Sequence, residues 1–219
     1  MTKARDQDDY FSLNYRDYKA QNPNRKLDHY LTQIEKPTNQ KELTLLDVGC
    51  GLGLFLNRAS QQHPAWQLWG TDVDPVAVAE VNKLVPTASV QIGSADTATH
   101  AAESFDVITA WDVLEHVEGR NAAGAAIHAM LKPNGLFCFV VPVYDGPFGP
   151  LVSLLDKDPT HVLKEAREPW LVWAGHNFEI VEWHGIFRYL VNSGWYIHQP
   201  TTTARSISPA ILVICAKSD

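Results

Sequence analysis

The sequence predicts an α/β fold: a Rossmann-like, seven-stranded, mostly parallel sheet with helices on both faces. Two observations support this prediction. Short apolar runs alternate along the chain with helical patterns, which is typical of an open sheet with parallel strands. In addition, "FCFVV" within 135–142 is apolar at every position, as strands covered on both faces are. At 219 residues the chain suits one domain. We expect residues 1–219 to form it, with a helical cap at the sheet edge (1–42) and an insertion on the ligand side (143–200).

Local signals define the elements. The first helix follows the glycines of 49–53 and ends at Gln62, because the residue before Pro64 disfavours helix. The second begins at Pro75, with Asp74 as its N-cap. The third, "NAAGAAIHAMLKPNG", ends at Pro133. Parts of "RKLDHYLTQIE" and "KEAREPWLVWAG" form two more. The strands are expected at 43–49, 66–72, 88–94, 104–111, 135–142, 177–184 and 210–217.

Composition excludes several classes of partner. The net charge is −7 and the basic residues are scattered, so we expect no nucleic-acid partner. No uncharged apolar run approaches the roughly 20 residues that cross a bilayer, and the first residues are too polar for a signal peptide. The three cysteines include no C-x-x-C pair, and two of them lie in apolar runs that suit buried thiols. These features favour a cytoplasmic protein without a membrane span.

Three alternate glycines interrupt the apolar stretch "LLDVGCGLGLFL" at 45–56. Glycine is required where the backbone takes a positive φ or a side chain would be in the way, so Gly49, Gly51 and Gly53 indicate a tight strand-to-helix turn close to a ligand. A P-loop is excluded because no Gly-Lys-Ser/Thr follows. The dinucleotide fingerprint would need a third glycine where Leu54 stands. The pattern therefore favours another adenosine-bearing ligand.

With these residues the chain resembles the class I S-adenosylmethionine (SAM) dependent methyltransferases, in particular small-molecule methylases of the ubiquinone-biosynthesis type. The glycine stretch is similar to their first motif. Further stretches follow in the family's order: "GTDVDP" (70–75), "GSAD" (93–96), "FDVITAWDVLEHV" (105–117) and "MLKPNGLFCFVVP" (130–142). The resemblance covers about 40–142. It implies the class I methyltransferase fold, SAM as cofactor and S-adenosylhomocysteine as product.

The resemblance also implies a set of cofactor-binding residues. Asp72 would accept hydrogen bonds from the ribose hydroxyls, which suits a carboxylate that ends a strand about 20 residues after the glycines. Val73 would lie beside it. Asp96 would accept from the adenine amino group, and the Ala95 amide would face a ring nitrogen. Each acid has an alternative role, that of capping a turn or a helix.

The methionine part of SAM would lie against the glycine turn. Asp47 and the backbone of Gly49 would face its ammonium group, and the amides that open the next helix suit its carboxylate. Trp111 and Asp112 follow the fourth strand, where the family's backbone passes the sulfonium. An aromatic face beside that cation is favourable, although Trp111 can equally be a core residue.

Two histidines are candidates for the general base that hydroxyl or ammonium acceptors require. His116, in "DVLEHV", is placed at the methyl-transfer site, where a structural role that orients the loop is the alternative. His161, in "DKDPTHV", follows an irregular Gly- and Pro-rich stretch, and a simple Asp-Pro turn is its alternative. No histidine has metal-ligand spacing, so we expect no catalytic metal.

Aromatic residues concentrate in 143–200, beyond the fifth strand, where acceptor pockets are usually built. Most are expected in the core, and a few would line a site for a flat or apolar small molecule. These residues are Tyr144, Phe148, Trp170, Trp173, Phe178, Trp183, Phe187, Tyr189, Trp195 and Tyr196.

The leading hypothesis is a methyltransferase that acts on oxygen or nitrogen, rather than carbon, of a small molecule. An NAD-dependent oxidoreductase is disfavoured by Leu54. A non-catalytic partner protein with the SAM fold is disfavoured because the cofactor residues are present. A DNA amino-methylase would need an N/D-P-P-Y/F motif where "WDVL" stands. The sequence leaves the acceptor open, since this fold hosts many chemistries.

Overall fold

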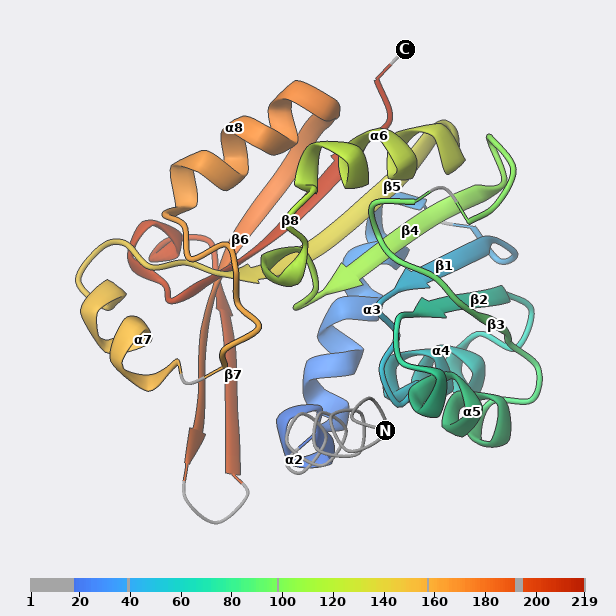
Figure 1. Ribbon diagram of the computed structural model, residues 1–219, viewed down its shortest axis with the longest axis horizontal. Coiled ribbons are helices and arrows are strands. Elements are labelled where there is room, and N and C mark those ends of the chain that lie inside the picture. The colour runs from blue at the N-terminus through green and yellow to red at the C-terminus, as the bar shows by residue number, and fades with distance from the viewer. Residues whose placement is uncertain (1–17, 39, 98, 157, 192–194, 219) are drawn as a thin grey trace, which may run out of the picture.

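A computed structural model describes residues 18–38, 40–97, 99–156, 158–191 and 195–218 (Figure 1). One eight-stranded sheet runs through the molecule in the order β3-β2-β1-β4-β5-β8-β6-β7. The first five strands in this order pair in parallel, and β8, β6 and β7 are antiparallel to their neighbours. The α/β fold with a mostly parallel sheet is thus confirmed, with eight strands rather than seven.

The strands lie close to their expected positions as far as β4, whereas β5 begins at Leu131, in residues that we expected to end a helix at Pro133. They are β1 Thr44–Val48, β2 Gln67–Asp72, β3 Ser89–Ile92, β4 Phe105–Trp111, β5 Leu131–Pro142, β6 Glu179–Val191, β7 Trp195–Thr201 and β8 Ala210–Ala216. The prediction was wrong about β6, which runs to Val191 rather than 184 and pairs with the unpredicted β7. Polar residues such as His198 and Gln199 break the apolar pattern of β7, which is why no strand was predicted there.

The helices are α2 Tyr18–Gln21, α3 Asn24–Thr38, α4 Leu54–Gln62, α5 Pro75–Leu84, α6 Arg120–Met130, α7 Gly149–Leu155 and α8 Arg167–Asn177, with short 3-10 turns η1 Leu114–His116 and η2 Arg205–Ile207. Asp74 caps α5 as expected, because its side chain accepts a hydrogen bond from the Val76 amide. Helix α7 occupies a stretch that we expected to be irregular. None of the helices in the described ranges is long and apolar enough to span a membrane.

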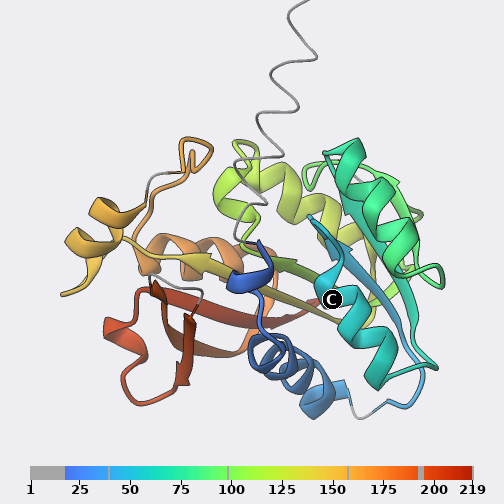
Figure 2. The same ribbon diagram turned by 90° about the horizontal axis from the view of Figure 1, so that it is seen from below.

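Helices cover both faces of the sheet (Figure 2). Leu27, Tyr30 and Ile34 of α3 pack with α4 residues against one face, beneath β1, β5 and β8. Helices α6 and α8 pack against the other face. The expected cap (1–42) therefore covers a face of the sheet rather than its edge, and its residues 1–17 lie outside the described part of the chain.

Strand order reverses between β1 and β4, because β2 and β3 lie to one side of β1 while β5 lies beyond β4. Loops diverge at the carboxyl ends of such a pair and leave a crevice, which is where open α/β sheets bind ligands. The fold therefore brings the glycine turn after β1 next to "WDVLEHV" after β4.

Candidate active site

A cavity of about 1140 Å³ opens at this switch point. Its wall includes most of the residues that the sequence singles out, from five separate segments of the chain. They are Asp47, Gly49, Gly51, Asp72, Val73, Ala95, Asp96, Trp111, Asp112, His116 and His161. Gly53 is absent from this wall. The cavity is large enough for a drug-sized ligand and a second small molecule.

The glycine turn needs its glycines for backbone reasons that the structure makes specific. Gly49, Gly51 and Gly53 have φ of 67°, 52° and 73°, in the left-handed region. A Cβ at Gly51 would collide with the Tyr18 hydroxyl, and one at Gly53 would approach Val81 to 2.7 Å. Gly53 serves as the N-cap of α4, so it shapes the turn from outside the cavity.

Asp72 ends β2 with its carboxylate in a fixed orientation. One oxygen accepts a hydrogen bond from the Gly51 amide at 2.8 Å, and the other accepts from the Asp74 amide at 2.9 Å. Burial raises the pKa of Asp72, and these amides oppose that shift. Because each carboxylate oxygen accepts more than one hydrogen bond, the group keeps capacity for hydroxyl donors in the cavity.

Asp47 lies buried at the end of β1. Its side chain accepts a hydrogen bond from the Thr109 hydroxyl at 2.7 Å. Burial raises the pKa of Asp47 to about 7, and the neighbouring Asp72 acts in the same direction. A cation bound beside it would reverse this shift, as the ammonium of the expected ligand would.

The adenine end of the expected site is more open. Ala95 is buried, whereas Asp96 is exposed and accepts a hydrogen bond from the Thr97 hydroxyl at 3.3 Å. Val73 is 60% exposed although it is apolar. A flat apolar ring in the cavity would cover it, and the chain thus offers both a polar and an apolar contact there. Together with the glycine turn and the two buried carboxylates, these groups fit the adenosine and methionine parts of SAM.

Trp111 ends β4 inside an aromatic cluster. It stacks on Tyr30 of α3 with ring centroids 4.3 Å apart, and Phe55 meets it edge-on at 5.4 Å. Its indole nitrogen is buried without a partner among the described residues. Trp111 is therefore a packing residue, which was the alternative role expected for it, and its ring also lines the cavity.

Asp112 adopts a φ of 59°, which turns the chain sharply after β4. Its carboxylate pairs with Arg188 of β6 and, at 3.5 Å, with Lys26 of α3. Burial alone would raise the pKa of Asp112, but the two cations outweigh burial and lower it to about 2. Asp112 thus links α3 to β6 through its two ion pairs, and it is itself part of the cavity wall.

His116 and its neighbour Glu115 lie in η1. Glu115 is buried, one of its oxygens has no partner among the described residues, and burial raises its pKa well above the ordinary value. His116 Nδ1 lies 2.9 Å from the Thr160 hydroxyl and 3.1 Å from the Thr160 carbonyl oxygen. Burial, aided by His161, lowers the pKa of His116.

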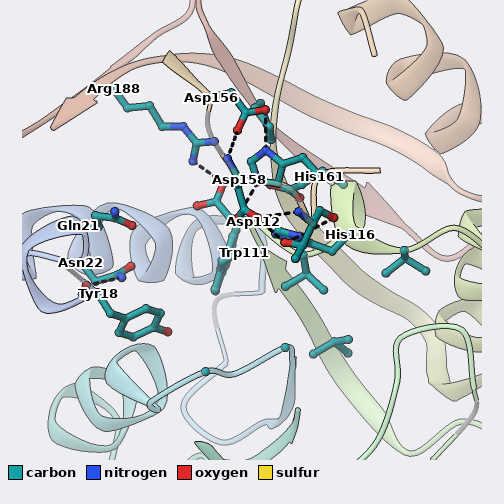
Figure 3. Close-up of a pocket in the computed structure, with 18 of the residues that line it drawn as sticks. Tyr18, Gln21, Asn22, Trp111, Asp112, His116, Asp156, Asp158, His161 and Arg188 are labelled. Carbon is teal, nitrogen blue, oxygen red and sulfur yellow. Dashed lines mark hydrogen bonds and ion pairs between the residues drawn. The ribbon is translucent and has the colours of Figure 1, made fainter. Parts of the chain in front are cut away.

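His161 and His116 lie next to each other in the cavity wall, with ring centroids 4.7 Å apart (Figure 3). Its Nδ1 lies 3.0 Å from Asp156 Oδ2 and 3.2 Å from the Tyr144 hydroxyl. Its Nε2 is 3.8 Å from Asp158. The two candidate histidines, 45 positions apart in sequence, therefore form one cluster in the cavity wall.

Glu115, His116 and His161 each bring one ligand atom to within 4.8 Å of the others. This convergence could not be seen in the sequence, where the spacing suits no metal motif. The absence of a catalytic metal stays a prediction.

Residues of α7, β6 and β7 line one side of the cavity, and Figure 1 shows these elements in the same part of the molecule. As expected for most of these aromatics, Trp170, Trp173 and Phe178 are core residues. The side chain of Trp195 lies outside the described part. Those that line the cavity are Tyr144, Phe148, Phe187, Tyr189 and Tyr196, together with apolar Leu151, Val152 and Leu155 of α7.

Four residues that sequence reasoning did not assign to the site also line the cavity: Tyr18, Lys26, Asp156 and Arg188. Figure 3 shows Tyr18, on the short helix α2, on the opposite side of the cavity from His161. Lys26 lies one helical turn before Tyr30, so the apolar periodicity of α3 held a signal for it. Arg188 and Asp156 gave none, because their partners are distant in sequence.

Comparisons with known proteins agree with this geometry. The chain matches a family described as a methyltransferase domain over residues 17–205. It is 37% identical over 111 residues to a ubiquinone biosynthesis O-methyltransferase of Pseudomonas syringae, and 36% identical over 111 residues to one of Pseudomonas fluorescens. Each match covers 48% of this chain and 47% of the relative, so the chain matches about half the length of these curated relatives.

Solved structures share the fold. The YcgJ protein of Bacillus subtilis superposes with a TM-score of 0.65 at 19% identity, over 88% of this chain and 99% of that one. A SAM-dependent methyltransferase of Methanosarcina mazei gives 0.62 at 17% identity, over 81% and 93%. The domain match spans most of the chain and the fold agrees with it. The chain therefore belongs to the class I SAM-dependent methyltransferases.

Proposed function

We propose that this protein transfers a methyl group from SAM to a hydroxyl oxygen of a small, mainly apolar or aromatic acceptor. The observation that carries the proposal is the single cavity that joins the glycine turn and Asp72 to the histidine pair and the aromatic wall. A donor and an acceptor bound at its two ends would meet beside His116 and His161. Holding two reactants in line supplies a large part of the rate enhancement in such reactions.

The donor end would bind SAM through the roles that the sequence suggests. Asp72 would accept from the ribose hydroxyls, Asp96 from the adenine amino group, and Asp47 would face the ammonium group. SAM supplies an electrophilic methyl carbon, which takes the acceptor's electron pair while the pair of the broken bond stays on sulfur. The chain's own residues bind, orient and exclude water.

The acceptor end of the cavity would suit an apolar molecule that carries an acidic proton. Phe148 and Phe187 pack edge-on at 5.6 Å beside the leucines of α7, which provides a surface for a ring or an alkyl chain. Between this surface and the donor end lies His161, which would take the proton of the acceptor as general base. Oxygen is favoured over nitrogen as the methylated atom because the similar Pseudomonas proteins are named O-methyltransferases.

The protein is proposed to need no metal for this reaction. Burial raises the pKa of Glu115 well above its ordinary value, so a metal bound there would have to displace the carboxyl proton against this shift. Overnight dialysis against a chelator should leave turnover unchanged, and restored activity on adding Mg²⁺ or Zn²⁺ would contradict this part of the proposal.

Calorimetric titration with S-adenosylhomocysteine tests the donor site, with NAD as the control ligand. We expect binding of the first and none of the second. Asp72→Asn should weaken binding about tenfold or more, because hydrogen bonds to a charged group are worth roughly 1.5–3 kcal/mol. Asp74→Asn is the matched control, since asparagine still caps α5. Equal affinity in wild type and Asp72→Asn would refute the ribose assignment.

Turnover with three acceptors that differ in one atom tests the reaction. 4-Propylphenol, 4-propylaniline and 4-propylthiophenol present oxygen, nitrogen and sulfur on the same apolar frame. Formation of S-adenosylhomocysteine with the phenol, faster than with the other two, is the expected result. Preference for the amine would change the proposal to N-methylation, and turnover with none of them would count against an aromatic acceptor.

A further inference from the structure

We propose that Asp156 is the positioning residue that makes His161, rather than His116, the general base. It would do so by fixing the Nδ1–H tautomer of His161, so that Nε2 is free to take the acceptor's proton. This inference rests on the proposed function, because it assigns roles within the same site. It goes beyond that function because it assigns different roles to His116 and His161, which are both candidate bases on sequence grounds.

Asp156 is held as a carboxylate. Its side chain is only 7% exposed, and Oδ2 receives Lys164 Nζ at 2.8 Å and the Tyr144 hydroxyl at 2.6 Å. The Asp158 amide donates to Oδ1 at 3.1 Å. Burial would raise the pKa of Asp156, but these donors outweigh burial and hold it well below the ordinary range. An ionised carboxylate can only accept hydrogen bonds.

The proton positions around His161 then follow from the contacts. Tyr144 donates its proton to Asp156, so its oxygen can only accept from other groups. Burial and the neighbouring carboxylate raise the pKa of Tyr144, which keeps that proton in place. His161 Nδ1 therefore faces two acceptors, Asp156 at 3.0 Å and Tyr144 at 3.2 Å, and it must carry a proton to bond with either. Its Nε2 is left with a lone pair, and Asp158 Oδ2 lies 3.8 Å from it, beyond hydrogen-bond distance.

His116 has the same tautomer but lacks a charged partner at Nδ1. The Thr160 hydroxyl donates to Asp158 at 2.5 Å, so its oxygen accepts from His116, as the Thr160 carbonyl also does. These acceptors are neutral. A second positive ring 4.7 Å away would also oppose a charge on His116. An imidazolium is thus stabilised by a contacting carboxylate at His161 only, within the described residues.

Because only His161 has a carboxylate at Nδ1, we assign the acceptor's proton to His161. As the acceptor oxygen forms its bond to carbon, the O–H bond breaks and the proton moves to His161 Nε2. The positive ring then lies against Asp156 until the proton passes to solvent. Removal of the orienting carboxylate in other histidine bases lowers turnover strongly while substrate binding persists, because the wrong tautomer presents a proton instead of a lone pair.

Long-range ¹H–¹⁵N correlation spectra of the ¹⁵N-labelled protein report each histidine tautomer without any acceptor. We expect Nδ1–H for His161 in the wild type and in Tyr144→Phe, which keeps Asp156. In Asp156→Ala the Tyr144 hydroxyl is free to donate to Nδ1, so the tautomer should change to Nε2–H. Asp158→Asn is the control that should keep Nδ1–H. An Nε2–H tautomer in the wild type, or no change in Asp156→Ala, would overturn the proposal.

Turnover with 4-propylphenol gives the second readout. In Asp156→Ala we expect kcat to fall about 100-fold at pH 7, with KM and S-adenosylhomocysteine affinity changed less than about twofold. The deficit should shrink as the pH approaches that of phenol ionisation, about 10, since an ionised acceptor needs no base. Asp156→Glu should restore part of kcat. A parallel rise of KM, or a deficit independent of pH, would assign Asp156 a merely structural role.

The two proposals fail in different ways. If S-adenosylhomocysteine does not bind, or no acceptor is methylated, the proposed function fails while the tautomer experiment still decides the geometry. If methylation occurs and the tautomer of His161 does not depend on Asp156, the positioning role fails alone.

Discussion

Arg188 of β6 donates a hydrogen bond to Asp112 at the end of β4, across 76 positions of sequence. All three residues line the cavity, since Lys26 of α3 also pairs with Asp112, at 3.5 Å. Two cations thus contact one carboxylate in the cavity wall. The Arg188–Asp112 pair ties the end of β4 to β6.

Removing one partner of this pair should destabilise the protein. Arg188→Gln leaves the Asp112 carboxylate with only the more distant Lys26, and we expect a loss of about 3 kcal/mol in the free energy of unfolding. The double variant Arg188→Gln/Asp112→Asn should recover most of it, because a neutral amide pair can bond and asparagine tolerates the positive φ. Urea unfolding of the four proteins in a double-mutant cycle measures the coupling, and additive losses would disprove it.

The affinity for S-adenosylhomocysteine should depend on pH through Asp47. Burial raises the pKa of Asp47 to about 7 in the free protein, and a bound ammonium group favours its ionised form. Because the complex then binds fewer protons than the free protein, affinity should rise roughly fivefold between pH 6 and 7 and level off above pH 8. Asp47→Asn should flatten this profile. Asp106→Asn, at the far end of β4, is the control that should keep it.

The glycine turn allows a stability test that separates backbone strain from ligand contact. Gly53 has a φ of 73° and a Cβ there would approach Val81 to 2.7 Å, so Gly53→Ala should lower stability by more than about 1 kcal/mol. Gly175, in α8, would give its Cβ a first neighbour at 3.9 Å, and Gly175→Ala should stabilise by about 0.4–1 kcal/mol. Thermal unfolding without ligand distinguishes them, and equal effects would contradict the strain argument.

Stability should decrease below about pH 6.5 because of a histidine pair between α3 and β7. His29 Nδ1 lies 3.0 Å from His198 Nε2, and Arg25 donates to the His198 carbonyl oxygen at 2.7 Å. Burial lowers the pKa of His29 to about 4 and that of His198 to about 3, and neighbouring positive groups act in the same direction. Between these values and about 6.5 the unfolded chain binds more protons than the folded one, so stability rises with pH.

His198→Gln is the variant that measures this effect. Its melting temperature should fall less than that of the wild type between pH 7 and 5, since one group that must stay neutral has been removed. His128→Gln, on the distant α6, serves as the control and should follow the wild type. A wild-type melting temperature that does not change over this range would refute the assignment.

The sequence predicted the part of the fold whose signals are local. Asp74 and Pro75 start α5, the three glycines form the turn, and the apolar run of β5 lies in the middle of the sheet, since each signal acts within a few residues. It missed β7, where His198 faces His29 and Arg188 rather than water. It also missed Asp156, because the role of that residue depends on His161, Tyr144 and Lys164 coming together in space. Long-range pairing of polar groups leaves no period in a sequence.

The split of the cavity between two parts of the chain has a consequence for how such a protein diversifies. Under the proposed function, residues 44–119 supply the donor end, while α7 and the β6–β7 hairpin supply the acceptor wall. Substitutions in the hairpin can therefore exchange one acceptor for another while the nucleotide-binding half keeps its sequence. A chimaera that receives another enzyme's residues for this wall, with Arg188 retained to anchor it, is a practical route to new methylated products.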